Sequence, residues 1–148
     1  MDAIDRKLVA LLLDDARLTY QELGRAVRLS ANTTADRVRR LRAKGIISGY
    51  HARLDYEAIG RPLILISDIR LREGYDNARF HASLADIPQV VEAFRVTGEY
   101  DYQLRLACTG TAEFERILDA LKTEHGVREV RSRLLLHDIP LPGDRILG

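Results

Sequence analysis

Residues 18–50 constrain the fold most, because they predict two short helices joined by a sharp turn. The first helix is expected to begin at Thr19, where Glu22 follows in the spacing of a capping box. The second is expected to follow Ser30, a good N-cap residue, and to end at Gly45. With so short a connection, the stretch predicts a helix-turn-helix, whose second helix enters the major groove of DNA, followed by a strand.

The predicted second helix carries the residues that would meet DNA. Wound at about 100° per residue, it places Ala35, Val38 and Leu41 on one side and polar or basic residues on the other. Small polar groups lie near its start, where a recognition helix meets base edges, and a basic run from residue 37 to residue 44 can reach phosphates. The candidate DNA-binding residues are Ser30, Asn32, Thr33, Thr34, Asp36, Arg37, Arg39, Arg40 and Lys44.

Within this set, Arg37, Arg39 and Arg40 are expected to contact phosphates, and the small polar residues are expected to adjust sequence preference. A solvated helix whose cations suit its own dipole is the alternative interpretation. The short turn and the paired caps favour DNA binding.

Length and charge agree with two modules in the 148-residue chain. Residues 1–60 carry 11 Lys/Arg against 8 Asp/Glu, whereas residues 61–148 carry 12 against 14, so the first module is the basic one. The single cysteine, Cys108, excludes an internal disulfide and a cysteine-based zinc cluster. No apolar run approaches the roughly 20 residues that span a bilayer, and the N-terminus lacks the basic start of a signal peptide. We therefore expect a cytoplasmic protein without a membrane partner.

The N-terminal module is expected to contain one more helix and a wing. Asp2 is the expected cap of the first helix. The apolar residues that are expected to share a small core are Ile4, Leu8, Leu11, Leu12, Leu18, Leu23, Ala26, Leu29, Val38 and Leu41. After the second helix of the motif, residues 45–60 are expected to form one or two short strands that lead out of the module.

The sequence of the second module predicts strands and helices in the order β-α-β-β-α-β, which is the ferredoxin-like split βαβ pattern. Strands are expected at residues 63–71, 90–97, 102–108 and 127–137. Asp76 and Thr111 are the expected helix caps, and Gly126 is expected to end the second helix. Because both helices cover one face of the sheet, the other face, with alternating apolar residues, is expected to need a partner.

Several motifs together resemble one known family. Asp2-Ala3-Ile4-Asp5-Arg6 is similar to the start of that family's first helix, and Leu29-Ser30, DRVRRL at 36–41 and GIISGY at 45–50 are similar to its DNA-binding signature. Thr97-Gly98-Glu99-Tyr100-Asp101-Tyr102 resembles the family's Gly-Asp-Tyr/Phe-Asp turn, and Gly126-Val127 opens the last strand. In this order and spacing, the motifs identify the chain as similar to the Lrp/AsnC family of leucine-responsive, or feast/famine, transcriptional regulators.

The resemblance implies an α+β protein with a winged helix-turn-helix domain at residues 1–60 and a ferredoxin-like RAM/AsnC-type domain at residues 61–148. Family members bind palindromic sites in double-stranded DNA as homo-oligomers, either dimers or octamers of four dimers. Many bind an amino acid or a related small-molecule effector between subunits. The effector-binding residues implied here are Gly98, Glu99, Tyr100, Asp101 and Tyr102. Among them, Gly98 would offer its backbone, Asp101 would pair with an ammonium group, and a tyrosine would close the apolar side.

Two positions depart from the family's pattern. Arg28 stands in the helix-turn-helix turn where the family usually has Gly, and a left-handed backbone there would cost about 1 kcal/mol. Glu99 replaces the commoner Asp in the second-domain turn and lengthens a possible ligand-contacting side chain. The identity of the effector is therefore left open, and a plain hairpin turn stays an alternative at 98–101.

Other functions find less support in the residues. The histidines have no metal-ligand spacing, and there is no Gly-rich phosphate loop or nucleophile elbow, so no catalytic residue, metal ligand or cofactor is assigned. Sirohaem decarboxylases resemble the same two-module architecture, but such an enzyme would not need cations along the second helix of the motif. An effector-independent architectural DNA-binding protein differs only in sequence specificity. An RNA-binding ferredoxin-like domain would need aromatic pairs on its central strands, which are absent.

Overall fold

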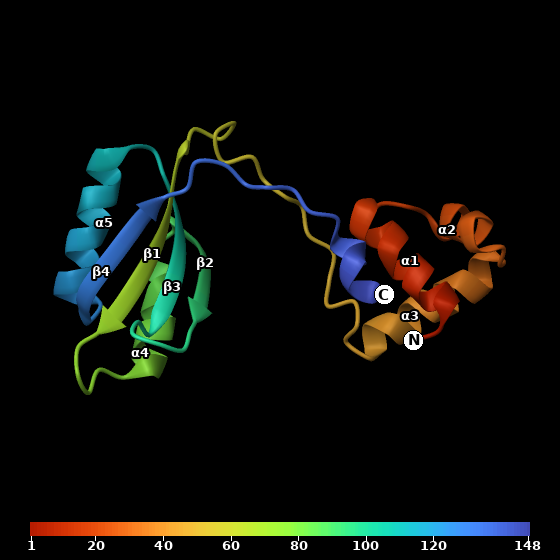
Figure 1. Ribbon diagram of the computed structural model, residues 1–148, viewed down its shortest axis with the longest axis horizontal. Coiled ribbons are helices and arrows are strands. Elements are labelled where there is room, and N and C mark those ends of the chain that lie inside the picture. The colour runs from red at the N-terminus through yellow and green to blue at the C-terminus, as the bar shows by residue number, and fades with distance from the viewer. The chain divides into compact units, whose positions relative to one another are not determined.

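The computed structural model describes residues 1–148 and divides into two compact units (Figure 1). One unit consists of Met1–Arg53 with Ile139–Gly148, and the other of Leu54–Asp138. The predicted domains, residues 1–60 and 61–148, differ from these units at two places: residues 54–60 belong to the second unit, and residues 139–148 to the N-terminal one. Residues 139–148 belong to the N-terminal unit because the short 3-10 helix η2 (Gly143–Leu147) packs against the first helix of the chain.

Three helices form the N-terminal unit: α1 (Ala3–Asp14), α2 (Tyr20–Val27) and α3 (Ala31–Ala43). The three predicted caps are confirmed. The side chain of Asp2 accepts the N–H of Asp5 at 2.8 Å, and Thr19 and Glu22 form the predicted capping box. The hydroxyl of Ser30 accepts the N–H of Thr33 at 3.1 Å at the start of α3.

A small core holds the three helices together. Leu8, Leu23 and Val38, one from each helix, are at most 1% exposed and pack together. The prediction for Ala26 is wrong, because Ala26 is exposed; its neighbour Val27 packs on the core, and so does Ile47 beyond α3. Val27 lies four residues after the buried Leu23 and therefore on the same side of α2, whereas Ala26 lies on the exposed side.

The predicted wing strands are wrong. Gly45, with φ of 71°, follows the end of α3 as expected, but residues 46–60 contain only turns, a bend and irregular backbone. A strand is stable only beside another strand, and the N-terminal unit contains none for this segment to pair with. The unit is therefore a three-helix helix-turn-helix module without a β-wing.

The second unit is built on a four-stranded antiparallel sheet in the order β2-β3-β1-β4 (Figure 1). Its strands are β1 (Leu63–Leu71), β2 (Val90–Arg95), β3 (Tyr102–Cys108) and β4 (Val127–Leu134). Its helices are α4 (Asn77–Ser83), which continues into the 3-10 helix η1 (Leu84–Asp86), and α5 (Thr111–Glu124). This is the predicted β-α-β-β-α-β order, so the ferredoxin-like fold is confirmed.

Both helices pack on one face of this sheet. Phe80 of α4 and Ile117 and Leu121 of α5 share a core with Ile69 and Leu104 of the central strands. The predicted alternation along β3 is confirmed, since Tyr102, Leu104, Leu106 and Cys108 are all buried. Burial raises the pKa of the Cys108 thiol, which agrees with a packing role in the core.

The predicted cap of α5 is wrong. Gly110 is the N-cap residue, with no side-chain cap, and Thr111 is the first residue of the helix. The carboxylate of Glu113 instead accepts the backbone N–H of Thr109 at 2.7 Å and its hydroxyl at 3.1 Å. A carboxylate in the first turn of α5 thus accepts from the residue that precedes the N-cap. Its negative charge is also favourable there because of the helix dipole.

The open face of the sheet is more polar than predicted. Ile64, Ile66, Ala107 and the exposed Phe94 are its apolar residues, because they alternate with the core-facing positions of their strands. Charged residues occupy most of its other positions, namely Asp68, Arg70, Glu92, Arg105, Glu129, Arg131 and Arg133. Ion pairs link several of them, such as Arg133 with Asp68 at 3.2 Å and Arg70 with Glu129 at 3.4 Å.

Candidate DNA-binding and effector sites

The turn between α2 and α3 fixes the position of the second helix of the motif. Gly24 is buried, and a Cβ there would lie 2.6 Å from the carbonyl oxygen of Leu29, so a larger residue would push the turn open. Arg28 adopts the left-handed backbone considered above, with φ of 60° and ψ of 44°. The strain of about 1 kcal/mol expected for a non-glycine residue therefore falls on Arg28.

Thr34 does not belong to the surface of α3. Its side chain is completely buried, and its hydroxyl lies 3.2 Å from the position that a Cβ of Gly24 would occupy. Thr34, Ala35, Val38 and Leu41 together make the inward side of the helix. Thr34 is thus a packing residue against α2, although its small polar side chain resembles that of its exposed neighbours.

Arg37 holds α3 to α1. Its Nη1 donates to the carboxylate of Asp2 at 2.7 Å and to that of Asp5 at 2.9 Å, and the side chain is only 20% exposed. The hydrogen bond from Arg37 is the main cause that lowers the pKa of Asp2 below its ordinary value. The guanidinium is therefore engaged by two carboxylates and is not free in the way that a phosphate contact requires.

The remaining candidates lie on one exposed surface. Ser30 and Thr33 share a hydroxyl–hydroxyl hydrogen bond of 2.8 Å at the start of α3, and Asn32 beside them is exposed. One turn later, Asp36 forms an exposed ion pair with Arg39. Beyond it, Arg40 and Lys44 are exposed and form no ion pair.

We call this exposed surface, made by Ser30, Asn32, Thr33, Asp36, Arg39, Arg40 and Lys44, the α3 surface. It presents hydroxyl and amide groups at one end and cations at the other. Those are the groups that donate to and accept from base edges and that neutralise phosphates, respectively. Arg42, also in the basic run, lies with its guanidinium 5.4 Å from the centre of the Tyr50 ring.

The candidate effector turn joins β2 to β3. Gly98 has φ of 109°, which an L side chain rarely adopts, and a Cβ there would meet nothing within 4 Å. The glycine is therefore required by the backbone of the turn and not by crowding within this chain. Glu99 is 71% exposed and pairs with Arg70 at 2.9 Å.

The other side chains of the turn are engaged with the sheet. The carboxylate of Asp101 accepts the backbone N–H of Leu71 at 2.8 Å. The hydroxyl of Tyr100 donates to Glu129 at 3.1 Å, and Arg70 lies 5.2 Å from the centre of the Tyr100 ring. The turn is thus tied to β1 and β4 by its own polar groups.

Tyr102 lies in the core and not at the surface of the turn. It is 2% exposed, its hydroxyl donates to Asn77 at 2.6 Å, and it lies 2.9 Å from Nε2 of His81. Burial raises the pKa of this phenol. Because β3 begins at Tyr102 and alternates from there, the same pattern that predicts its burial removes it from the ligand side of the turn.

Sequence reasoning missed three contributors to these sites. Asp5 joins Asp2 in holding Arg37, and Arg70 and Glu129 form the polar surroundings of the turn. The alternation along β1 places Arg70 on the open face, but only the strand register brings Glu129 opposite it. Pairing between distant strands is not readable from a local pattern.

Two further observations concern the whole chain. None of its helices is both long and apolar enough to cross a membrane. No group of three or more His, Cys, Asp or Glu side chains is arranged to hold a metal ion.

Three helices with a tight α2–α3 turn and an exposed polar and basic second helix define a helix-turn-helix DNA-binding protein, here joined to a ferredoxin-like domain. Residues 65–140 match the family model described as the Lrp/AsnC ligand-binding domain, and residues 1–48 match that of a winged helix-turn-helix DNA-binding domain. The chain belongs to the Lrp/AsnC family and is a transcriptional regulator of that type, with a DNA-binding and a ligand-binding domain.

Relatives agree over almost the full length. The Bkd operon transcriptional regulator of Pseudomonas aeruginosa is 35% identical over 144 residues, which covers 95% of this chain and 94% of the relative. The leucine-responsive regulatory protein of Rhizobium meliloti is 35% identical over 142 residues, with coverage of 94% and 91%. A transcriptional regulator of Neisseria meningitidis, solved as a complex with L-methionine, superposes with a TM-score of 0.88 at 32% identity and covers 97% of this chain and 95% of that one.

Proposed function

We propose that this regulator binds two-fold symmetric DNA sites as a homo-oligomer, reads them through the α3 surface, and responds to an amino acid bound beside the β2–β3 turn. The observation that carries the DNA-binding part is the division of α3 into a side engaged within the unit, with the buried Thr34 and the paired Arg37, and an exposed side of polar groups and cations. On that exposed side, Arg40 and Lys44 form no ion pair. Asn32, Thr33 and Asp36 are placed to adjust base preference, and Arg39, Arg40 and Lys44 to contact phosphates.

Sequencing of the genomic fragments that the purified protein captures tests this function. We expect enrichment of a palindromic motif whose half-sites lie about one helical turn, or 34–36 Å, apart. A variant with Asn32, Thr33 and Asp36 all replaced by Ala should lose or change the motif while it keeps nonspecific affinity. Capture of DNA without any common motif would instead support the architectural alternative.

The open face of the sheet supports a dimer. Phe94, on the edge strand β2, is 52% exposed on this face, and the rows of opposite charges of the face can pair with the same rows of a second copy in an isologous contact. The charges that surround Phe94 make the contact specific in register, because a shifted pairing would oppose like charges. Assembly of dimers into an octamer is part of the same proposal.

Sedimentation of the full chain tests the oligomer. We expect a dimer or larger species for the wild type and a shift to monomer for Phe94→Asp, because the new carboxylate would be buried against another copy. Ala112→Asp is the matched control, since it adds the same group to an exposed position on α5, which covers the opposite face. Wild-type protein that sediments as a monomer at micromolar concentration would contradict the proposal.

The β2–β3 turn is proposed as the effector site because exposed charges of both signs meet there. Glu99 and Arg70 form an ion pair that is accessible on the Glu99 side, and Asp101 uses one carboxylate oxygen for the Leu71 N–H and keeps the other. A carboxylate and a guanidinium are the partners that the ammonium and carboxylate of an amino acid require. The Neisseria relative that was solved with L-methionine makes this ligand class a reasonable first choice.

Thermal-shift titration of L-amino acids, methionine and leucine included, tests the effector. A ligand should raise the Tm of the wild type and have a smaller effect on Glu99→Gln and Arg70→Gln, while Glu115→Gln, exposed on α5, serves as the matched control. A hit should then change operator affinity, by ~5–150-fold for a coupling of about 1–3 kcal/mol. Equal stabilisation of all variants would overturn the assignment to this turn.

A further inference from the structure

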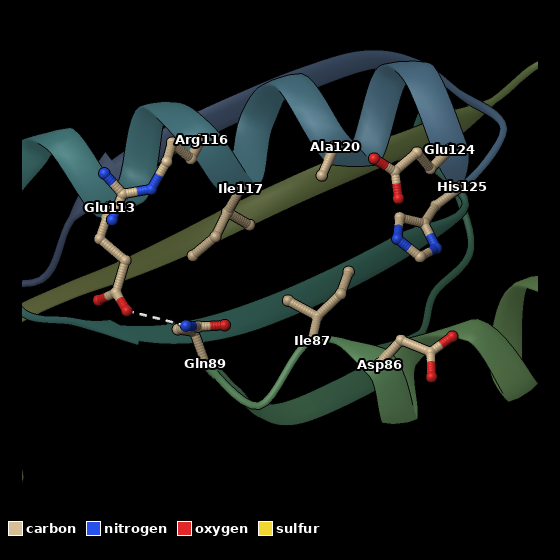
Figure 2. A pocket seen from close by; sticks show the side chains of 9 residues that line it. All are labelled: Asp86, Ile87, Gln89, Glu113, Arg116, Ile117, Ala120, Glu124 and His125. Carbon is tan, nitrogen blue, oxygen red and sulfur yellow. Dashed lines mark hydrogen bonds between the residues drawn. The ribbon is translucent and has the colours of Figure 1, made fainter.

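A pocket of about 430 Å³ lies on the helix side of the second unit and is used by neither proposed site (Figure 2). We call it the α5 pocket, because most of its wall belongs to that helix and the residue after it. Its lining residues are Asp86, Ile87, Gln89, Glu113, Arg116, Ile117, Ala120, Glu124 and His125. None of them belongs to the β2–β3 turn, so the pocket is distinct from the effector site proposed above.

One end of the α5 pocket carries negative charge without a partner. Asp86 and Glu124 form no ion pair and no side-chain hydrogen bond, and Figure 2 shows Glu124 beside the imidazole of His125 and Asp86 on the facing segment at the same end of the pocket. His125 is only 7% exposed, and its Nδ1 has no hydrogen-bond partner. Because Nδ1 is fully covered, the ring can meet a ligand in the pocket only through Nε2, which also forms no hydrogen bond within the chain. The two carboxylates at this end favour a cation with N–H donors, which an alkylammonium group supplies.

The middle of the pocket is apolar. Ile87 lies on one wall and Ile117 and Ala120 on the other, between the acidic end and the opposite end (Figure 2). These side chains offer no hydrogen bonds and suit an aliphatic chain. A small, fully hydrated cation would leave this part of the pocket unused.

The opposite end is cationic. Arg116 lines the pocket, is exposed, and forms no ion pair. Glu113 beside it is already satisfied: it accepts from Thr109, from Gln89 at 2.8 Å and from Arg61 at 3.1 Å. The hydrogen bond from the Thr109 backbone, followed by that from Gln89, lowers the pKa of Glu113 to about 2. Because Arg61 balances the charge of Glu113, Arg116 is the group at this end that can take a ligand carboxylate.

The distance between the cationic and acidic ends of the pocket determines how far apart the two charges of a ligand must be. Arg116 and Glu124 lie on the same side of α5, with Ala120 midway, and eight helical residues rise about 12 Å. The side chains can shorten this span, but an α-amino acid with an apolar side chain carries both charges on one carbon and cannot reach both ends. A compound with an ammonium and a carboxylate separated by a methylene chain can.

We propose that the α5 pocket binds an ω-amino carboxylate, a class that includes lysine through its side-chain ammonium. The ammonium lies between Asp86 and Glu124 and donates to Nε2 of His125. The methylene chain packs on Ile117 and its apolar neighbours, and the carboxylate pairs with Arg116.

Isothermal titration of the full chain with 6-aminohexanoate tests the proposal, with hexylamine and hexanoate as single-ended comparisons. We expect 6-aminohexanoate to bind more tightly than either. Asp86→Asn with Glu124→Gln should weaken it by roughly tenfold or more, and so should Arg116→Gln, because each change removes a charge-assisted interaction. Asp119→Asn is the matched control, because it removes a carboxylate from the same helix outside the pocket and should leave the affinity unchanged.

Three results would overturn the proposal: no binding of 6-aminohexanoate, equal binding of one single-ended compound, or equal binding by the pocket variants. The substituted side chains are exposed, so the variants are expected to fold, and circular dichroism checks this. Glu99→Gln separates the two sites. Affinity for 6-aminohexanoate should be unchanged in Glu99→Gln, and a loss there would place the compound at the β2–β3 turn instead.

Discussion

The α3 surface and the β2–β3 turn both carry polar residues expected to meet a ligand, but their side chains are engaged to different degrees. On α3, Arg40 and Lys44 have no partner within the protein, and Asn32 is exposed. In the turn, Glu99 and Asp101 are already bound to other groups of their own unit. A DNA phosphate can therefore bind Arg40 or Lys44 without breaking a contact, whereas an effector at the turn must compete with existing ones.

The same difference occurs within α3 itself. Arg37 and Arg40 are one turn apart in sequence, yet Arg37 is held by two carboxylates of α1 while Arg40 is free. Residue type and helical position alone give both the same expected role. What separates them is the partner helix, which brings Asp2 and Asp5 to one arginine only.

The largest expected effect distinguishes these two arginines. Arg40→Ala should weaken operator binding by roughly tenfold, since one charged contact is lost, and should reduce the slope of log affinity against log salt by about 1. Arg37→Ala should lower the Tm of the N-terminal unit, because two carboxylates lose their shared partner. Fluorescence anisotropy over a salt series and a thermal melt measure both. An unchanged salt slope in Arg40→Ala would show that Arg40 does not contact phosphate.

In the turn, the second prediction separates an engaged carboxylate from an accessible one. Asp101→Ala leaves the backbone N–H of the buried Leu71 without its acceptor and should lower the free energy of unfolding by about 1–3 kcal/mol. Glu99→Ala removes only an exposed ion pair and should change it by less than about 1 kcal/mol. Urea denaturation compares them, with Asp101→Asn as the control that keeps an acceptor oxygen. An equal loss in free energy of unfolding in Asp101→Ala and Glu99→Ala would show that the two carboxylates are not engaged to different degrees.

The third prediction concerns acid. The pKa of Glu113 is lowered from 4.5 to about 2, so its contribution to stability is fully present above pH 4.5 and is lost as the pH falls toward about 2. Glu113→Gln should therefore be less stable than the wild type at pH 6, and the difference should shrink across this window. Glu115→Gln, on the exposed side of α5, is the control. The urea midpoints of the wild type and Glu113→Gln are measured at a series of pH values. A difference between them that does not change with pH would contradict a stabilising role of the Glu113 carboxylate.

The smallest effect is expected at the strained turn. Arg28→Gly relieves a left-handed backbone but adds freedom to the unfolded chain, so a net gain of only about 0.5 kcal/mol is expected. If operator affinity falls in the same variant, the strain is retained for a DNA contact. A loss of stability would show that the arginine side chain makes a stabilising contact in the turn.

Local patterns predicted most of the fold. Capping residues placed four helix starts, Asp76 at the start of α4 included, and the alternation along β3 gave the buried face, because both depend on neighbours in sequence. The prediction of wing strands was wrong because the N-terminal unit has no partner strand. The prediction of Thr111 as a helix cap was wrong because the carboxylate of Glu113 accepts from Thr109 instead. The same limit applies to the sites. The exposure of Arg40 follows from helical periodicity. The ion pairs of Arg37 depend on the packing of α1 against α3, which a local sequence pattern does not predict.

Selection of DNA sequences from a random library tests directly whether the α3 surface reads bases. The wild type and a variant with Asn32, Thr33 and Asp36 replaced by Ala are each incubated with a random duplex library, and the bound pools are sequenced. We expect the wild type to enrich a two-fold symmetric motif and the variant to lose or change it at the same positions in both half-sites. The same motif recovered by both proteins would contradict the assignment of α3 as the helix that reads the DNA.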